Sequence, residues 1–203
     1  MLTHNHSHLA KPEKGFTLVE LLVVLSVVGV LFATFGTFFT NYLSLYFNYQ
    51  KDANTFAEVA NQSTRISDVL RGIVDINSES ATDINAYAYF APTDTYTSVV
   101  HYYLSADQKS IMVDVTPMTA NPPNGTPVTA SKRTYTIISN YQPQTGVNLF
   151  TYYDASGTAL PTPVANEHTI TSITVNLSTT ATHNSKGQQL ATTVSLRNRK
   201  TNL

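Results

Sequence analysis

One apolar stretch near the start of the chain constrains the fold more than any other feature. Residues 16–39 contain a single charged side chain, that of Glu20. At about 1.5 Å per residue, a helix of this length reaches about 36 Å and can cross a hydrocarbon layer of about 30 Å. A carboxylate within such a span costs on the order of 2.5–3.5 kcal/mol on insertion scales. We therefore predict a transmembrane helix over 16–39 whose buried charge needs a partner.

The residues around the start of this span form a motif. A polar leader ends in Lys14-Gly15, and Phe16-Thr17-Leu18-Val19-Glu20 opens the apolar stretch. The run KGFTLVELLVVLSVVGVL resembles the junction of type IV prepilins and of the pseudopilins of type II secretion. In that family a short basic leader ending in glycine precedes Phe-Thr-Leu-Val/Ile-Glu and an apolar helix. A plain signal anchor, or a chance match, is the alternative.

The resemblance implies a processing chemistry for these residues. A membrane prepilin peptidase would recognise the leader, with Lys14 beside the cut, and cleave between Gly15 and Phe16. The same enzyme would N-methylate the new amino terminus on Phe16. Glu20 would then pair with the N-terminal ammonium of a neighbouring subunit during filament assembly, since a buried carboxylate is tolerated when a cation meets it.

Residues 1–15 differ from a secretory signal peptide. They lack an apolar stretch, and the expected cleavage point precedes the hydrophobic run. Lys11 and Lys14 favour a cytoplasmic amino terminus. We expect one span in the cytoplasmic membrane, an extracytoplasmic head, and residence in a pilus or pseudopilus after assembly. Alternating histidines in the leader suggest a metal chelate, but a discarded polar tail explains them equally well: His4, His6 and His8.

The helix is expected to continue beyond the span as an amphipathic segment over 40–75. No proline occurs between Phe16 and Val74. Small and apolar residues recur every three or four positions, which predicts one buried face: Tyr46, Tyr49, Ala53, Phe56, Ala60, Ser63, Ser67, Leu70 and Val74. Gly29 and Gly36 are either weak points of the helix or sites of close helix packing. Thr37 stands where the family often has a proline, so local melting is not favoured over packing.

The rest of the chain, residues 76–203, predicts a β-rich head. Alternating β-branched and aromatic runs indicate strands over 83–91, 98–104, 111–117, 133–141, 148–153, 168–180 and 188–199. Prolines and turn residues predict loops over 119–127 and 161–167. A long helix followed by six to eight antiparallel strands is an α+β arrangement. The resemblance implies the same pilin-like fold, with the helix packed on an antiparallel sheet.

Composition excludes several kinds of function. The chain has no cysteine, which excludes a disulfide framework, thiol catalysis and thiolate metal sites, and departs from the many pilins that close a loop with a disulfide. A formal net charge of −1 does not indicate that the chain as a whole binds nucleic acid. The basic C-terminal residues are read as a solvated strand edge and not as a DNA contact: Arg197, Arg199 and Lys200.

The head offers no pattern typical of catalysis or of a cofactor. Four aspartates suggest calcium, but none lies in a run of closely spaced acidic ligands: Asp94, Asp107, Asp114 and Asp154. His101, His168 and His183 are far apart and lack a nucleophile motif. The tyrosines of AYAYF and HYY alternate as cross-strand packing residues do. We predict no enzyme, no metal and no cofactor.

Local features of the large head resemble the J-type minor pseudopilins and their pilus counterparts, the PilW-like group. They are TRISDVLRGI at 64–73, LFTYYDASGTAL at 149–160, and ITSITVNLS paired with TTVSLRNR at 170–178 and 192–199. This likeness implies a minor subunit in a tip complex that primes a filament, with prepilin peptidase and other pilins as partners. The alternatives are an adhesive or DNA-binding pilin carried on the filament, and a simple membrane-anchored surface protein.

Overall fold

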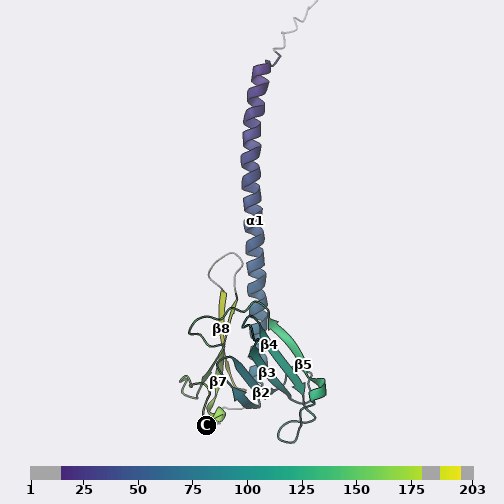
Figure 1. Cartoon of the computed structure of the whole chain (residues 1–203), viewed down its shortest axis with the longest axis vertical. Coiled ribbons are helices and arrows are strands. Elements are labelled where there is room, and N and C mark those ends of the chain that lie inside the picture. Colours follow the sequence, from purple (N-terminus) through teal and green to yellow (C-terminus); the bar gives the residue numbers. More distant parts are fainter. Residues whose placement is uncertain (1–14, 180–187, 198–203) are drawn as a thin grey trace, which may run out of the picture. The chain divides into compact units, whose positions relative to one another are not determined.

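The computed structural model describes residues 15–179 and 188–197. One long helix, α1 (Leu18–Arg71), is followed by eight strands within these ranges (Figure 1). The chain divides into two units, residues up to Phe47 and residues from Asn48 onward, which are described separately. Several residues singled out in the sequence lie outside the described ranges: His4, His6, His8, Lys14, His183, Arg199 and Lys200.

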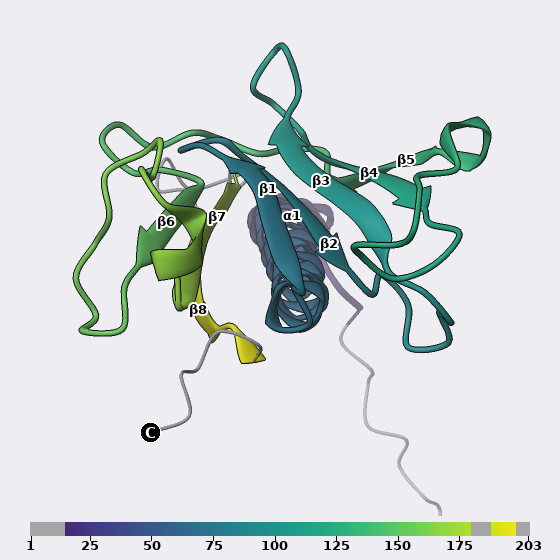
Figure 2. The ribbon, with the colours of Figure 1, turned by 90° about the horizontal axis from the view of Figure 1, so that it is seen from below.

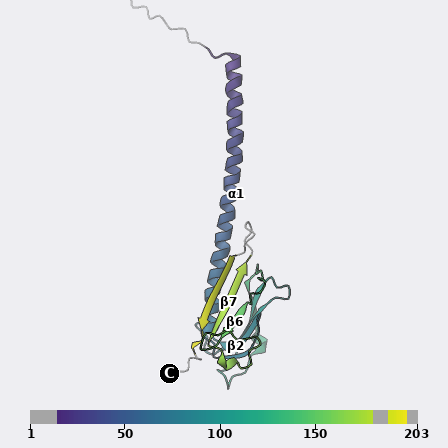
Figure 3. The ribbon, with the colours of Figure 1, turned by 90° about the vertical axis from the view of Figure 1, so that its left-hand side faces the viewer.

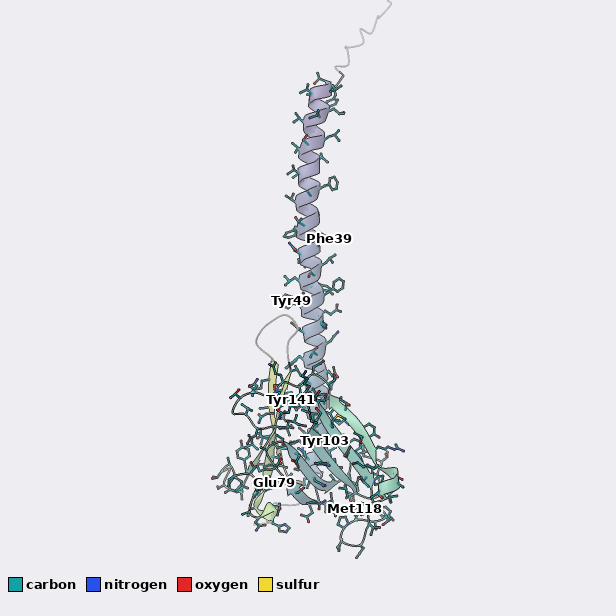
Figure 4. The ribbon with its side chains drawn as sticks, viewed as in Figure 1. Phe39, Tyr49, Glu79, Tyr103, Met118 and Tyr141 are labelled. Atoms are coloured by element: carbon teal, nitrogen blue, oxygen red, sulfur yellow. The ribbon has the colours of Figure 1, made fainter. Side chains whose placement is uncertain are left out.

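The first unit consists of the apolar part of α1. This helix is long and apolar enough to cross a membrane, by length and composition. None of the described residues 15–47 is buried within the chain, and the side chain of Phe39 stands out from the helix (Figure 4). The hydroxyls in this stretch donate to carbonyls one turn earlier, as those of Ser26 to Leu22 at 2.8 Å and Thr34 to Val30 at 2.9 Å do. Lipid therefore meets few unsatisfied polar groups here.

The second unit contains a five-stranded antiparallel sheet that follows chain order. Its strands are β1 (Asp75–Glu79), β2 (Asp83–Ala88), β3 (Ser98–Leu104), β4 (Ile111–Pro117) and β5 (Arg133–Ile138). Alternate residues of β2, β3 and β4 are buried, because successive side chains of a strand point to opposite faces. Gln108 provides the positive φ of 56° that the tight β3–β4 turn uses.

A second antiparallel sheet completes the unit, in the order β6-β7-β8 (Figure 3). Its strands are β6 (Phe150–Tyr153), β7 (Ser172–Thr179) and β8 (Gln188–Ser195). A 3-10 turn over Glu167–Thr169 precedes β7, and the side chain of Asn166 caps it by accepting the backbone N–H of His168.

The core lies between the C-terminal part of α1 and the two sheets (Figure 2). Ile66, Leu70 and Ile73 meet residues of both sheets in one apolar cluster. The hydroxyls of Ser63 in α1 and Thr192 in β8 are joined by a hydrogen bond of 2.7 Å. The second sheet is thus attached to the helix by a polar contact as well as by the core.

The turn between β1 and β2 joins the two sheets. The backbone N–H of Phe150 donates to the carbonyl of Ala81 at 3.1 Å. The hydroxyl of Tyr152 donates to the carbonyls of Ser80 and Asp83 at 3.0 and 3.1 Å. The backbone N–H of Val164 donates to the buried carboxylate of Glu79, which Figure 4 places among the strands. These bonds pair polar groups where the sheets meet, whereas the second carboxylate oxygen of Glu79 has no hydrogen-bond partner among the described residues.

Tyr152 and Tyr102 form a matched pair for testing this junction. Both are buried, and burial raises the pKa of each hydroxyl, but the hydroxyl of Tyr102 has no hydrogen-bond partner among the described residues. We expect Tyr152→Phe to lower the free energy of unfolding by about 1–3 kcal/mol, because the backbone carbonyl of Ser80 loses the hydroxyl that donates a hydrogen bond to it. Tyr102→Phe is expected to be neutral or stabilising. Urea unfolding of the full chain in detergent measures both, and equal losses would contradict the role of Tyr152.

The α+β fold expected from the sequence is confirmed, with one long α-helix and antiparallel sheets among the described residues. Strands 98–104 and 111–117 have the predicted bounds. The helix ends at Arg71, whereas the helical segment was expected to run to residue 75, because the N–H groups of Gly72 and Ile73 bond three residues back and tighten the last turn. Strand β1 was not predicted.

The predicted buried stripe of the helix is correct only at its C-terminal end. Ser63, Ser67 and Leu70 are buried. Tyr46, at 54% exposed, and Tyr49, which projects from the helix in Figure 4, are not. Phe56 is also exposed, since the buried part of the helix begins at Val59.

Candidate processing and assembly site

The expected cleavage point lies in an accessible segment. Gly15, Phe16 and Thr17 precede α1 without regular secondary structure, and all three are exposed. The side chain of Phe16 is 79% exposed. A peptidase can therefore bind the Gly15–Phe16 bond in an extended form without unwinding the helix.

The first turn of the helix is closed by a capping box. Thr17 accepts the backbone N–H of Glu20 on its hydroxyl at 3.2 Å, and the Glu20 carboxylate accepts the backbone N–H of Thr17 at 3.4 Å. This reciprocal pair satisfies two N–H groups that a helix start leaves without partners. The carboxylate also lies at the positive end of the helix dipole. Glu20 thus has a local role in a single chain, which the sequence pattern Thr-x-x-Glu indicates but which was not predicted.

The glycines of the span have no packing role within the chain. A Cβ added at Gly29 or Gly36 would meet nothing within 4 Å. The helix runs through both positions without interruption. The described contacts within a single chain therefore do not explain why glycine occupies these two positions.

Two of the four aspartates accept hydrogen bonds within turns. Asp107 accepts the hydroxyl of Ser105 at 2.6 Å and the N–H of Lys109, and these hydrogen bonds lower its pKa. Asp154 accepts the hydroxyl and the N–H of Ser156, which lower the pKa of Asp154 in the same way. Both carboxylates act as turn acceptors.

The other two aspartates also have protein partners. Asp114 accepts Lys132 at 2.7 Å and the hydroxyl of Thr134 at 2.6 Å. Partial desolvation acts to raise the pKa of Asp114, but these bonds outweigh it and hold the pKa below its ordinary value. Asp94 accepts the backbone N–H of Ala91 at 2.8 Å. Among the described residues, no group of three His, Cys, Asp or Glu side chains is placed to hold a metal ion.

The described histidines do not form a catalytic group. His101 stacks on Tyr103 with ring centroids 4.8 Å apart, and its Nε2 lies 3.6 Å from the carboxylate of Asp83. His168 is exposed in the 3-10 turn before β7. The position of His101 in β3 and that of His168 in the 3-10 turn explain both residues without a catalytic role.

The remaining sequence candidates are spread over the second unit. Arg197 is exposed just after β8. Tyr102 packs in the core as predicted, but Tyr89 is 38% exposed, and its hydroxyl receives a hydrogen bond from Asn121 at 3.1 Å. The expectation of core packing is therefore wrong for Tyr89, because it lies beyond the end of β2.

One comparison with known families finds a match near the start of the chain. Residues 10–35 match the family described as the prokaryotic N-terminal methylation motif. This match spans the leader end, the Gly15–Phe16 junction and most of the apolar stretch. No curated protein matches the chain.

The match, together with the apolar helix, supports the type IV pilin and pseudopilin family, whose members are structural subunits and not enzymes. The motif implies processing by prepilin peptidase, N-terminal methylation and assembly with other pilins. The apolar helix indicates a membrane anchor before assembly.

Proposed function

We propose that this chain is a minor pilin or pseudopilin that is cut between Gly15 and Phe16 and joins a filament through its N-terminal helix. The observation that carries the proposal is the methylation motif at an exposed, non-helical junction followed at once by an apolar helix. Residues 1–15 act as the leader, with Lys14 in its recognition and Phe16 as the methylated residue. Residues 16–39 span the membrane, 40–75 continue the helix, and 76–203 form the extracytoplasmic head.

Glu20 is proposed to change partners during assembly. In the single chain its carboxylate closes the capping box with Thr17 and has no cation within ion-pair distance among the described residues. Cleavage would create an ammonium on Phe16, four residues before it. Exchange of the backbone N–H of Thr17 for the ammonium of a neighbouring subunit would strengthen the interaction, because two opposite full charges then attract each other.

A tip or initiation role is proposed from the head. The described part of the head has eight strands in two sheets, and its segments 149–160 and 170–178 resemble those of the J-type group in sequence. A subunit that starts a filament needs contacts on its head that a repeating subunit lacks. This role predicts that the protein is scarce in sheared filaments.

The proposed function is tested by intact-mass and N-terminal peptide analysis. The protein is taken from membranes and from sheared filaments of cells with an active prepilin peptidase. We expect a chain that begins at N-methylated Phe16 and a low share of it in the filaments. A chain that begins at Met1 would contradict the pilin proposal, and a high share in the filaments would contradict only the minor role.

A further inference from the structure

The uncharged part of α1 is longer than the hydrocarbon layer of a membrane. Residues 21–50 contain no charged side chain. At about 1.5 Å per residue this stretch measures about 45 Å, whereas the hydrocarbon core of a bilayer is about 30 Å thick and its headgroup layers bring the total to about 40–45 Å. Charge therefore does not decide where along 21–50 the helix leaves the hydrocarbon.

The aromatic residues of the helix change in kind at one point. Between Glu20 and Asn41 they are all phenylalanines, and all are exposed: Phe32, Phe35, Phe38 and Phe39. The next two are Tyr42 and Tyr46, which are 59% and 54% exposed. A phenylalanine side chain is apolar throughout, whereas tyrosine joins an apolar ring to a hydroxyl and is enriched where a membrane meets water. The change from phenylalanine to tyrosine thus indicates where the hydrocarbon-facing part ends.

The length of the span places the boundary at the same position. A carboxylate is least costly at the edge of the hydrocarbon core, so Glu20 belongs at the edge nearest the cleavage point. From there about 30 Å of hydrocarbon takes up about 20 residues and ends at about residue 40. A tilt of about 20° moves this end by about one residue. The adjoining headgroup layer, about 5–7 Å thick, then contains Tyr42 and Tyr46.

The two tyrosine side chains suit such a layer. The hydroxyl of Thr40 donates to the carbonyl of Gly36 at 3.0 Å, whereas those of Tyr42 and Tyr46 have no protein acceptor among the described residues. The ring of Tyr46 packs edge-on against that of Phe47, with centroids 5.8 Å apart and 69° between the ring planes. The rings therefore offer an apolar surface to acyl chains, and the hydroxyls need acceptors that phospholipid phosphate and ester oxygens supply.

We propose that Tyr42 and Tyr46 bind the phospholipid headgroup layer on the head side of the membrane and so set the depth of α1. Their rings lie against the acyl chains next to the headgroups, and their hydroxyls donate to phosphate or ester oxygens. Leu18, the first helical residue, lies about 36 Å before Tyr42, so the Gly15–Phe16 bond reaches the opposite headgroup layer. The inference rests on the proposed membrane span, but not on cleavage or on filament assembly.

The test uses the absence of cysteine from the chain, because a spin label on one introduced cysteine then reports a single position. Leu45→Cys places the label between the two tyrosines and leaves both intact. The full chain is studied at high dilution in vesicles of phosphatidylcholine and phosphatidylglycerol. Electron paramagnetic resonance measures the access of the label to oxygen, which concentrates in hydrocarbon, and to a nickel chelate, which stays in water. Phe32→Cys is the reference for hydrocarbon, and Tyr96→Cys, exposed in the head, is the reference for water.

We expect the label at Leu45 to lie at a depth between the two references. Nickel access equal to that at Tyr96 would place the tyrosines in water, and oxygen access equal to that at Phe32 would place them in hydrocarbon, so either result would overturn the proposal. Spin–spin broadening at high dilution would show that a second copy, and not lipid, covers the tyrosines. If the label at Phe32 is itself open to the nickel chelate, the membrane span fails, and this inference fails with it.

Variants without the hydroxyls test their role directly. In the Leu45→Cys background, Tyr42→Phe combined with Tyr46→Phe is expected to move the label deeper by about 5 Å, about one helical turn, because the apolar surface then continues to Phe47. Tyr49→Phe is the matched control, since it removes a hydroxyl beyond the headgroup layer and is expected to leave the depth unchanged. Circular dichroism checks the fold of each variant. An unchanged depth in the double variant, or an equal shift in Tyr49→Phe, would contradict the role of the two hydroxyls.

Discussion

Glu20→Ala is expected to block filament incorporation while cleavage and membrane insertion continue. In an assembled filament the substitution would leave the ammonium of a neighbouring Phe16 buried without a counter-ion. Removing one partner of a buried ion pair costs about 3–5 kcal/mol. At about 1.4 kcal/mol per factor of ten, this corresponds to a loss of about a hundredfold or more in subunit affinity.

This variant also removes the capping box, so controls are needed. Glu20→Gln keeps an acceptor for the N–H of Thr17 but no charge. Thr17→Val removes the capping hydroxyl and keeps the charge. If the charge acts in assembly, Glu20→Gln fails like Glu20→Ala, and Thr17→Val assembles.

The measurement is the share of methylated protein in sheared filaments relative to membranes, by quantitative mass spectrometry. Normal incorporation of Glu20→Gln would contradict the ion pair. Loss of assembly in Thr17→Val alone would assign the role of Glu20 to the helix cap. Failure of cleavage in Glu20→Ala would instead place Glu20 in peptidase recognition.

Local sequence signals predicted the parts of the fold that depend on neighbours in the chain. Strands β3 and β4 were predicted because seven-residue alternating runs are joined by a short polar turn. Strand β1 was missed because its sequence, Asp-Ile-Asn-Ser-Glu, has one apolar residue and owes its extended form to pairing with β2. β-propensity measures fit to a sheet surface, and that surface is set by the rest of the fold.

Contacts between distant segments were not predictable from spacing. The separation of β6–β8 into a sheet of their own depends on which strands pair, and periodicity does not specify partners. The same holds for Tyr152, whose hydroxyl joins the sheets across some seventy positions of the chain. Gly15, Phe16 and Glu20 could be proposed as a candidate site because they lie in one short motif. Arg65, Phe90 and Tyr135, in contrast, meet only in the folded chain.

Gly15→Leu is expected to abolish processing without disturbing the protein. The resemblance implies that the peptidase needs the small residue before the cut, since a side chain there would keep the backbone from its catalytic groups. The substrate itself has no such need. A Cβ at Gly15 would meet nothing within 4 Å, and its φ does not lie in the left-handed region. A processing defect therefore reports on the enzyme site and not on misfolding of the chain.

Gly15→Ala provides the graded control, with a smaller side chain at the same open position. We expect the full-length leader form to accumulate in membranes for Gly15→Leu, with Gly15→Ala between this variant and the wild type. Because the uncleaved chain has no ammonium on Phe16, Gly15→Leu should also be absent from filaments. Immunoblots of membranes and sheared filaments, with intact mass, measure both effects. Cleavage of Gly15→Leu at the wild-type rate would reject Gly15–Phe16 as the processed bond, whereas its assembly with the leader attached would reject the requirement for a free Phe16 ammonium.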